Sequence, residues 1–345
     1  MFMGFSEEII DWYHQNKRDL PWRKTTDPYQ IWMSEIILQQ TRVNQGLNYF
    51  NKFIENYPTI DLLANAPEKE ILNHWQGLGY YSRARNLHFT AKLIVNEYNG
   101  IFPTEYKDVL NLKGIGEYTA AAITSFAYGL SYPVIDGNVY RVLSRVFGIE
   151  LPIDSTEGKK EFKKLATELI DSKNPSDYNQ AIMEFGALQC TPRKPDCENC
   201  RLRLSCYALK NELIGELPKK EKKRKKRNRF FNYIVLINDD AIYLKERTAK
   251  DIWIGLYDFP LIESEKQLDT FITIIDSYKD SGLELQKKSP EFKHLLSHQK
   301  IYATFWLVTA NKTAKFDSNH TKIPLVEINN YPVPKLIENY LQTIL

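Results

Sequence analysis

The chain has 345 residues, of which 43% are hydrophobic, and a formal net charge of +3 at pH 7. This length suits two domains of roughly 100–200 residues each, and no segment approaches the roughly 18 consecutive apolar residues that a membrane span needs. The N-terminus carries Glu7, Glu8 and Asp11 and no apolar run, so we do not interpret it as a signal peptide. We therefore expect a soluble, cytoplasmic protein of two domains that has no membrane partner.

The first informative segment is a helix predicted over residues 31–43, where apolar residues recur every three and four positions. Glu35 shares one helix face with apolar residues one turn before and one turn after it. Burial raises the pKa of a carboxyl group, which is what a general acid working near neutral pH requires. A structural ion pair of Glu35 with Arg23 or Arg42 is the alternative, and this helix alone does not decide between the two.

A turn with two glycines follows in LKGIGEYTA at residues 112–120, just before an apolar helix predicted from Tyr118 to Tyr128. Gly114 and Gly116 permit a tight turn, and the free amides at the start of the next helix form an anion site. Most such turns merely join helices. This one lies between two helices rather than after a strand, which favours a helix-hairpin-helix that grips a DNA phosphate over a dinucleotide fold.

Asp136 lies in the next motif, PVIDGNVYRVLSRVF, before a helix predicted over residues 139–147. Its simplest role is to cap that helix. Its chemistry suggests a second role, because glycosidic bond cleavage uses two carboxyl groups, one to protonate the leaving group and one to face the cationic sugar. Glu35 and Asp136 form such a pair only if the fold brings them together. One more helix is predicted over residues 162–170.

All four cysteines lie in one short loop with the spacing C-x6-C-x2-C-x5-C, at Cys190, Cys197, Cys200 and Cys206. A disulfide needs an oxidising compartment, and structural zinc sites usually combine a close pair with a second pair or with histidines. Four thiolates without histidine suit an iron-sulfur cluster, whereas zinc and chance clustering remain alternatives. Basic residues of this loop predict a phosphate contact, or else a solvated surface: Arg193, Lys194, Arg201 and Arg203.

A strongly basic run follows, with nine Lys or Arg and one Glu from Lys219 to Arg229. Its local charge of +8 leaves 3 minus 8, or −5, for the rest of the chain. The run has no apolar residue, so we interpret it as a solvated linker, with a polyanion-binding arm and a nuclear localisation signal as alternatives. The predicted organisation is a helical domain at 1–215, a linker at 216–229 and a second domain at 230–345.

After the linker, helical spacing gives way to alternation of apolar and polar residues. The alternation from Phe231 to Ile237, the turn at residues 238–240 and then Ile242 and Leu244 predict a β-hairpin. We therefore expect an α+β second domain beside an all-α first one. Its other predicted elements are a strand at residues 300–308 and helices at about residues 263–278 and 335–345.

Several of these motifs, in this order, resemble those of adenine DNA glycosylases of the MutY type, in the helix-hairpin-helix superfamily that also contains endonuclease III. The resemblance implies a mainly α helix-hairpin-helix glycosylase domain with an iron-sulfur loop, followed by a smaller α+β Nudix-like domain. The segments that carry it are RDLPWR at 18–23, WMSEIILQQTRV at 32–43, GLGYYSRARNL at 77–87, LKGIGEYTAAAI at 112–123, VIDGNVYRVLSR at 134–145, NQAIMEFGALQCTPRKPDC at 179–197 and the remaining cysteines.

The resemblance also implies roles for single residues. Glu35 would protonate the extruded adenine at N7 and later assist the attack of water, and Asp136 would stabilise the oxocarbenium-like sugar through a covalent adduct. Asn138 would orient these groups, with Tyr118 beside them. The cysteines would hold one 4Fe-4S cluster. The other implied contacts are Gln180 with the adenine edge, Arg23 and Leu38 in the same pocket, Gln40 and Tyr80 entering the duplex with Tyr80 as a wedge, and Gly114 and Gly116 at a DNA phosphate.

Position 118 separates two branches of this superfamily. Enzymes similar to endonuclease III place a lysine there, whose amine forms a Schiff base and permits strand cleavage. Tyr118 has no amine, so we expect a monofunctional enzyme that leaves an abasic site. The alternatives are a bifunctional glycosylase for oxidised pyrimidines and a non-catalytic DNA-binding protein with a redox-sensing cluster.

In the C-terminal domain, HLLSHQ at 294–299 is similar to the family's FSH loop, although Leu296 stands where phenylalanine is usual. This implies that Ser297 and His298 contact 8-oxoguanine. No Glu-rich metal-binding box follows WIGLYDFP at 253–260, which argues against a Nudix hydrolase. We expect base excision repair by a monomer that acts on double-stranded DNA with adenine opposite 8-oxoguanine or guanine, at the nucleoid if the source is bacterial. A sliding clamp or mismatch-repair protein would dock at the linker.

Overall fold

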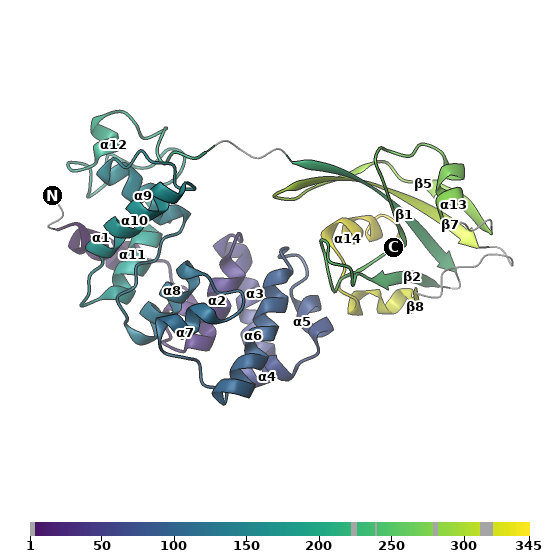
Figure 1. Ribbon diagram of the computed structural model, residues 1–345, viewed down its shortest axis with the longest axis horizontal. Helices are drawn as coiled ribbons and strands as arrows, with labels where there is room; N and C mark the ends of the chain where they lie inside the picture. Colours follow the sequence, from purple (N-terminus) through teal and green to yellow (C-terminus); the bar gives the residue numbers. More distant parts are fainter. Residues whose placement is uncertain (1–3, 222–225, 239, 279–281, 311–319) are drawn as a thin grey trace. The chain divides into compact units, whose positions relative to one another are not determined.

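The structure is a computed structural model that describes residues 4–221, 226–238, 240–278, 282–310 and 320–345. Its chain divides into two units (Figure 1), one formed by Met1–Asn65 and Phe89–Lys222 and the other by Ala66–His88 and Lys223–Leu345. The division near residue 222 falls within the predicted linker, of which residues 222–225 lie outside the described residues. The second unit also takes in residues 66–88, which the sequence prediction placed in the helical domain.

The first unit contains helices and no strands among its described residues, as predicted for an all-α domain. Helix α6 (Ser82–Tyr98) begins in the second unit and continues into the first. The helices that lie within the first unit are α1 (Phe5–Asn16), η1 (Pro21–Arg23), α2 (Pro28–Leu38), α3 (Val43–Asn56), α4 (Ile60–Asn65), α7 (Tyr106–Asn111), α8 (Glu117–Tyr128), α9 (Gly137–Phe147), α10 (Thr156–Leu169), α11 (Pro175–Leu188) and α12 (Tyr207–Lys210).

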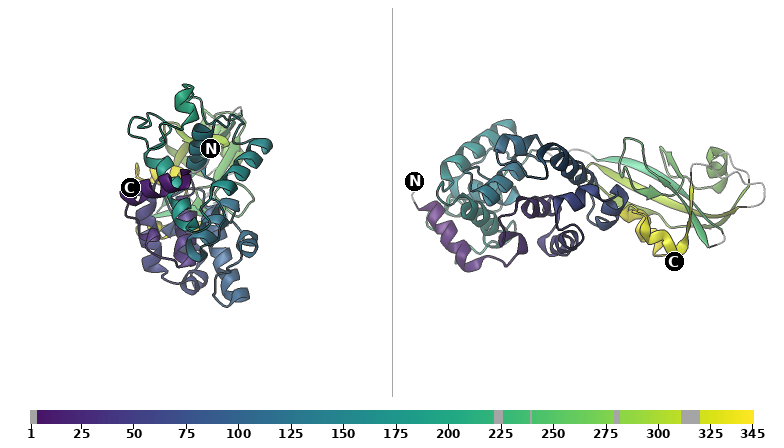
Figure 2. Two further views of the ribbon diagram at one scale, coloured as in Figure 1. Left: turned by 90° about the vertical axis from the view of Figure 1, so that its left-hand side faces the viewer. Right: turned by 90° about the horizontal axis from the view of Figure 1, so that it is seen from below.

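Helix α9 forms part of the main core of this unit, together with α1, α8, α10 and α11. Figure 2 shows the purple N-terminal helix α1 beside the teal helices of this unit. Its apolar residues recur every three and four positions, so Val139, Val142 and Leu143 all face the core and are buried. Across this core, Trp12 of α1 meets Phe185 of α11 edge to face, with 5.0 Å between ring centroids. The packing fixes both ends of α9, including its N-terminus at Asp136.

The helix predicted over residues 31–43 ends at Leu38, so the second half of that prediction is wrong. The chain leaves helical geometry at Gln39 and Gln40, where Gln40 has a φ of 59°, and α3 begins at Val43. Helix α3 packs closely on this end, because a Cβ atom at Gly46 would lie 2.7 Å from a methyl carbon of Leu38. The four residues between Leu38 and Val43 are polar but include neither Gly nor Pro, so no helix-stop signal marks the break.

The second unit is built on a mixed sheet in which β1 and β7 run parallel and pair along most of their length. The predicted hairpin is confirmed, since Ile237 of β1 pairs with Ile242 of β2, although residue 239 of its turn lies outside the described residues. The strands are β1 (Arg227–Asn238), β2 (Ala241–Glu246), β3 (Tyr257–Asp258), β4 (Leu261–Ser264), β5 (Leu283–Lys288), β6 (Phe292–Leu295), β7 (Gln299–Ala310) and β8 (Thr321–Pro324); the helices are α5 (Glu68–His74), α13 (Phe271–Tyr278), η2 (Leu325–Asn330) and α14 (Lys335–Leu341).

Both faces of this sheet are covered. On one face Phe305 of β7 stacks on Tyr340 of α14, with 3.9 Å between ring centroids. On the other face Trp306 packs with Ile274 of α13. Neighbouring residues of one strand therefore enter different cores, as the alternation of side chains along a strand requires.

Three predicted boundaries in this unit are wrong. The helix predicted at 335–345 ends at Leu341, where α14 ends. The predicted helix at 263–278 starts only at Phe271, because Leu261–Ser264 forms β4 and pairs with β1. The predicted linker extends to residue 229, but β1 begins at Arg227. The basic run hides this start, because Arg229 is buried by ion pairs with Asp251 and Glu263 rather than solvated.

Residues 66–88 are tied to the second unit by specific contacts. The hydroxyl of Tyr81 donates to the carbonyl oxygen of Val333 at 3.4 Å, and the guanidinium of Arg85 donates to that of Ile254. The ammonium of Lys69 lies 3.3 Å from the ring centroid of Tyr331. This segment therefore completes a unit whose sheet comes much later in the chain. Among the described residues, no helix is both long and apolar enough to cross a membrane.

Candidate active site

Seven of the predicted site residues line one cleft of about 700 Å³ in the first unit. They come from η1, α2, α8, α11 and the start of α9, so the fold brings together parts of the chain that are far apart in sequence. The seven residues are Arg23, Glu35, Leu38, Tyr118, Asp136, Asn138 and Gln180.

Glu35 projects from α2 into this cleft and is only 6% exposed. The pKa of its carboxyl group is raised to about 7, mainly by burial and also by the charge of Asp136, while a hydrogen bond with Tyr118 and the charge of Arg23 oppose the shift. No ion pair joins Glu35 to Arg23 or Arg42 within the described part of the chain. The arrangement is that of a buried acid that holds a proton up to neutral pH.

Asp136 is the N-cap of α9, as its position in the sequence predicted. One oxygen, Oδ1, accepts hydrogen bonds from the backbone amides of Asn138 and Val139, both at 2.8 Å. The other, Oδ2, accepts from the side-chain nitrogen of Asn138 at 2.7 Å. Burial raises the pKa of Asp136, and these hydrogen bonds oppose the shift. The cap therefore also fixes the direction in which the carboxylate faces the cleft.

Arg141, one turn further along α9, was not predicted as a site residue. Its Nη2 donates to Oδ1 of Asn138 at 2.8 Å, and its Nε donates to the backbone oxygen of Cys190 at 2.7 Å. It is 7% exposed and lines the cleft. Its guanidinium therefore connects the group that orients Asp136 with the first cysteine of the cysteine loop.

Sequence reasoning also missed Glu184, which lies on α11 and is 1% exposed. Arg18 and Arg23 each form an ion pair with its Oε2, at 2.5 and 2.8 Å. Burial alone would raise the pKa of Glu184, but hydrogen bonds from Arg18 and Arg23 outweigh it and lower the pKa to about 2. The cleft thus holds one carboxyl group that stays protonated up to neutral pH and one that is ionised throughout.

Gln180 lies one turn before Glu184 on the same helix, and its side chain is held on both sides. The hydroxyl of Tyr13 donates to its Oε1 at 3.0 Å, and its Nε2 donates to the hydroxyl oxygen of Ser176 at 3.2 Å. An amide fixed in this way presents a defined donor and acceptor pattern to a ligand in the cleft.

The predicted phosphate-binding turn lies between α7 and α8. Gly114 has a φ of 84°, which favours glycine, and Gly116 is the N-cap of α8. Gln40 and Tyr80, the two residues predicted to enter the duplex, also have positive φ values, of 59° and 48°. Such strained backbone in residues other than glycine is often found at functional sites. Gln40 is exposed and does not line the cleft.

The four cysteines line one cavity of the first unit, between the end of α11 and α12, and all are free thiols. Burial raises the pKa of Cys200 to about 11. A single zinc ion needs sulfur atoms about 2.3 Å away, and among the described residues no three His, Cys, Asp or Glu side chains are arranged to hold one ion. The cavity is lined by four thiols and no histidine, a set of ligands that suits a metal group held by thiolates alone.

Arg145 braces this loop from α9. It is 2% exposed, its Nη1 donates to the backbone oxygen of Thr191 at 2.8 Å, and the same nitrogen lies 3.5 Å from the Sγ of Cys190. Its Nε donates to the backbone oxygen of Leu217 at 3.1 Å. One buried guanidinium thus ties α9 to the chain at Thr191 and at Leu217, on either side of the last three cysteines.

Ser297 and His298 line a separate cavity of about 190 Å³ within the second unit, and Tyr80 lines it too. The hydroxyl of Ser297 lies 3.1 Å from Nδ1 of His298, and Nε2 of Gln299 lies 2.7 Å from Nε2 of His298. Trp253 and Arg85 contribute further walls. The three residues predicted to act at the lesion therefore meet at one place.

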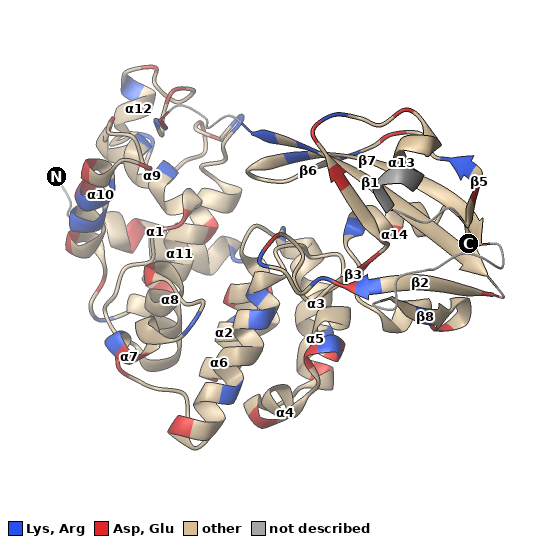
Figure 3. Ribbon diagram, turned by 45° about the vertical axis from the view of Figure 1, so that its right-hand side comes forward, with Lys and Arg blue, Asp and Glu red and all other residues tan. Residues whose placement is uncertain are grey.

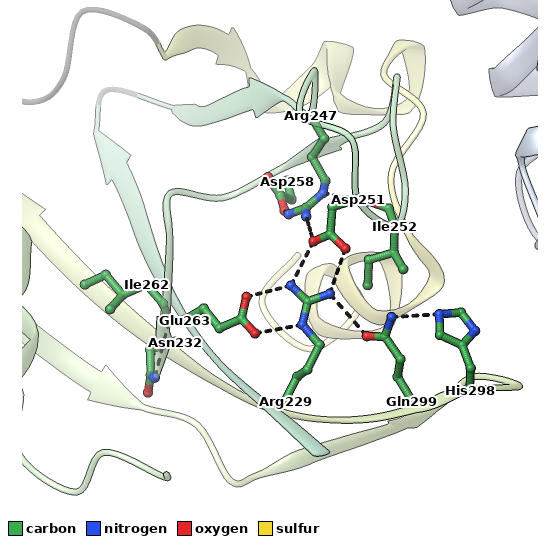
Figure 4. Close-up of polar contacts among 10 residues, drawn as sticks. All are labelled: Arg229, Asn232, Arg247, Asp251, Ile252, Asp258, Ile262, Glu263, His298 and Gln299. Carbon is green, nitrogen blue, oxygen red and sulfur yellow. Dashed lines mark hydrogen bonds and ion pairs between the residues drawn. The ribbon is translucent and has the colours of Figure 1, made fainter. Parts of the chain in front are cut away.

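A charged cluster holds this loop in place (Figure 4). The buried guanidinium of Arg229 binds Asp251 and Glu263 and also donates to Oε1 of Gln299 at 3.1 Å. Arg247 extends the cluster from Asp251 to Asp258. Because Gln299 contacts both Arg229 and His298, the orientation of the histidine depends on this cluster.

Comparison with known proteins agrees with this geometry. Residues 33–171 match the HhH-GPD superfamily of base excision DNA repair proteins, and residues 232–343 match the NUDIX domain. The adenine DNA glycosylase of Buchnera aphidicola subsp. Baizongia pistaciae (strain Bp) is 36% identical over 348 residues, which cover 96% of this chain and 95% of that protein. The predicted two-domain fold class is confirmed by these matches.

Two solved structures share the fold of the first unit. A thermostable thymine-DNA glycosylase is 32% identical, with a TM-score of 0.56 over 60% of this chain and 95% of its own. Endonuclease III in a non-covalent DNA complex is 22% identical, with a TM-score of 0.53 over 60% of this chain and 94% of its own. The long match to the Buchnera protein carries the assignment: this chain belongs to the adenine DNA glycosylase family, within the HhH-GPD superfamily of base excision DNA repair proteins.

Proposed function

We propose that this protein is a monofunctional DNA glycosylase that excises adenine mispaired with 8-oxoguanine, or with guanine, from double-stranded DNA and leaves an abasic site. The observation that carries the proposal is the pairing of Glu35 and Asp136 in one cleft, the first with a raised pKa of about 7 and the second fixed by three hydrogen bonds. Two carboxyl groups in different environments are what glycosidic bond cleavage requires.

Catalysis begins with the flipped adenine in the cleft. Extrusion of a base costs a few kcal/mol and least at a mispair, which contributes to selectivity. Protonated Glu35 gives its proton to the adenine ring, so that the base leaves as a neutral molecule. Asp136 then stabilises the positive charge on the sugar, and Asn138 keeps its carboxylate in position.

Adenine recognition falls to the other end of the cleft. The fixed amide of Gln180 both donates and accepts hydrogen bonds, which suits the amino group and ring nitrogens of adenine. Glu184 has no free acceptor, because Arg18 and Arg23 occupy both oxygens of its buried carboxylate, and it therefore serves to hold the guanidinium of Arg23 at the cleft.

The second unit would read the opposite base. Ser297 and His298 offer hydrogen-bonding groups, and Tyr80 is 50% exposed beside them. An exposed aromatic ring on strained backbone is suited to enter a base stack at the mispair. This division of labour makes duplex DNA the partner, and we propose that the enzyme acts as a monomer. A clamp or mismatch-repair partner at the linker remains a prediction.

We further propose that Cys190, Cys197, Cys200 and Cys206 hold one 4Fe-4S cluster. When bound, the cluster ties the loop 190–206 rigidly through four metal-thiolate bonds. Arg145 balances the negative charge of the thiolates, and Arg193 and Lys194 of the loop are then presented to DNA phosphates. Arg201 is instead held by Glu8 and Asp11 of α1. Excision itself is carried out by the residues of the cleft.

Single-turnover excision tests the function. A duplex with adenine opposite 8-oxoguanine is incubated with excess enzyme, and samples are quenched with and without hot alkali, beside a duplex with cytosine in place of adenine. Strand breaks only after alkali support the proposal. Breaks without alkali indicate a lyase, and binding without any breaks supports a non-catalytic sensor.

A further inference from the structure

A second cavity in the first unit shares the ring of Tyr118 with the catalytic cleft. It has a volume of about 480 Å³ and no role in the mechanism above. Ile135 lines it, while the next residue, Asp136, lines the cleft. The two cavities are therefore neighbours, and the boundary between them lies where the sugar of the excised nucleotide would face Asp136.

Tyrosines form much of the wall of this cavity. Tyr106 and Tyr132 are stacked, with ring centroids 4.1 Å apart and ring planes 14° from parallel. Tyr132 is 39% exposed, so its ring remains accessible to a ligand. Tyr140 adds a third ring, which is held edge to face on Phe162 of α10 at 4.9 Å. Flat, partly exposed rings of this kind bind bases and sugars of nucleic acids.

Lysines form the rim. Lys159, Lys160 and Lys163 of α10 line the cavity, and Figure 3 shows the blue ribbon segments that mark Lys and Arg along this helix. The ammonium of Lys163 is 2.8 Å from a carboxylate oxygen of Glu117, so that pair adds no net charge. Within the described residues, Lys159 and Lys160 have no ion-pair partner and leave the rim with two uncompensated positive charges.

We propose that this cavity binds the sugar-phosphate backbone of the adenine-containing strand next to the excised nucleotide, with Lys159 and Lys160 on a phosphate and Tyr132 against the adjoining sugar or base. The inference rests on the proposed function, because the cleft beside it must receive the flipped adenine. Every sugar within a strand carries a phosphate on each side, so a nucleotide held in the cleft brings its flanking phosphates to the neighbouring cavity. The shared wall at Tyr118 is where the backbone passes from one cavity to the other.

The same chemistry, a phosphate beside an aromatic ring, would also suit a free nucleotide. A free nucleotide has no reason to lie beside the catalytic cleft, whereas a strand that enters the cleft must leave it. We therefore commit to the DNA strand and treat nucleotide binding as a contrary outcome of the test.

The test is the salt dependence of duplex binding. Each variant is made in an inactive Glu35→Gln background, so that the intact duplex with adenine opposite 8-oxoguanine survives the titration. The Lys159→Ala/Lys160→Ala double variant is expected to flatten the plot of log affinity against log salt by about 0.9 for each phosphate that the lysines no longer bind. Tyr132→Ala is expected to weaken binding by roughly tenfold at every salt concentration, with the slope unchanged.

Lys164→Ala is the matched control, because Lys164 is exposed on the same helix and does not line the cavity. A slope for the double variant no flatter than that of the control overturns the inference. So does lysine-dependent binding of deoxyadenosine monophosphate together with an unchanged duplex slope. Failure of the wild-type enzyme to release adenine would instead overturn the proposed function, and the two failures are told apart by separate measurements.

Discussion

Arg141 donates a hydrogen bond to the side-chain oxygen of Asn138 at 2.8 Å. The nitrogen of that same amide donates to Asp136, and Arg141 also holds the backbone oxygen of Cys190. A continuous path of three hydrogen bonds thus joins the cysteine loop to the carboxylate of Asp136. The position of Asp136 consequently depends on how firmly the cysteine loop is held.

We expect Arg141→Lys to slow excision by about tenfold or more, because one lysine cannot replace the separate hydrogen bonds of the guanidinium, and removing a hydrogen bond from a charged group costs about 1.5–3 kcal/mol. Duplex binding should be largely retained. Single-turnover rates measure the effect, and Arg203→Lys, an exposed arginine of the cysteine loop, is the control. An Arg141→Lys enzyme as fast as this control would show that the path does not position Asp136.

Glu35→Gln is expected to abolish excision and to change the pH dependence of stability. Folding raises the pKa of Glu35 to about 7 from 4.5, so any stabilisation by this group is full below about pH 4.5 and is lost as the pH rises through 7. Above pH 7 the glutamine variant should be more stable than wild type by on the order of 3 kcal/mol.

Urea unfolding of both proteins at pH 5 and pH 8 measures this difference. The stability gain of the variant should be much larger at pH 8, and the excision rate of the wild type should fall above pH 7 as Glu35 loses its proton. An equal gain at both pH values would mean that the pKa of Glu35 is not raised. Near wild-type turnover by Glu35→Gln would remove Glu35 from the role of general acid.

Two substitutions of Asp136 separate its structural role from its chemical one. Asparagine is as good a helix N-cap as aspartate, so Asp136→Asn should remove the negative charge and cripple excision while melting near the wild-type temperature. Asp136→Ala should lose excision and about 1 kcal/mol of stability as well. Thermal melting measures the structural role and single-turnover rates measure the chemical one. An Asp136→Asn enzyme that is active but less stable would show that Asp136 only caps the helix.

If the cysteine loop holds an iron-sulfur cluster, the purified protein should be coloured. Wild-type enzyme purified without oxygen should be brown, with absorbance in the blue, and should contain iron and sulfide. Cys200→Ser is expected to lose the colour and to weaken duplex binding, since the loop is no longer held. Metal analysis gives the readout, and stoichiometric zinc without iron would reject the cluster.

Discrimination between 8-oxoguanine and guanine should depend on Ser297, on His298 and on Gln299, which contacts His298. Ser297→Ala and His298→Ala are expected to reduce the preference for 8-oxoguanine over guanine opposite adenine, by roughly tenfold for each hydrogen bond removed. Gln299→Ala should have a smaller effect in the same direction, because Gln299 joins His298 to Arg229. Excision from the two duplexes is compared, with Gln286→Ala on β5 as control. An unchanged ratio in all three variants would place lesion recognition elsewhere.

Much of the site was predictable because its residues sit in short, specific motifs. The cysteine spacing, the two glycines before α8 and the acid on an apolar helix face each suggest a chemical role beside a structural alternative. The roles expected for Asn138, Tyr118 and Gln180 come only from the family resemblance. Glu184 was missed because its partners, Arg18 and Arg23, lie more than 160 residues away in sequence, and a glutamate among apolar helix residues gives no sign of such a pairing.

The errors in the fold have the same origin. In the sequence, the basic residues at the start of β1 resemble a solvated run. In the folded unit, Arg229 instead forms ion pairs with Asp251 and Glu263. Similarly, the sequence pattern places residues 263 and 264 in a helix, whereas in the structure Leu261–Ser264 forms a strand that pairs with β1. In both cases a long-range partner overrides the local pattern, which single-sequence reasoning cannot anticipate.

Because residues 66–88 belong to the second unit, one part of that unit is synthesised long before its sheet. This segment leaves the ribosome long before β1 and α14, so the donors on Tyr81 and Arg85 must wait for the carbonyl groups of Val333 and Ile254. The helical unit is then interrupted by a stretch that belongs to a later structure. A fragment cut at the basic run would separate the sheet from the stretch that completes it, so the second unit is not a detachable module.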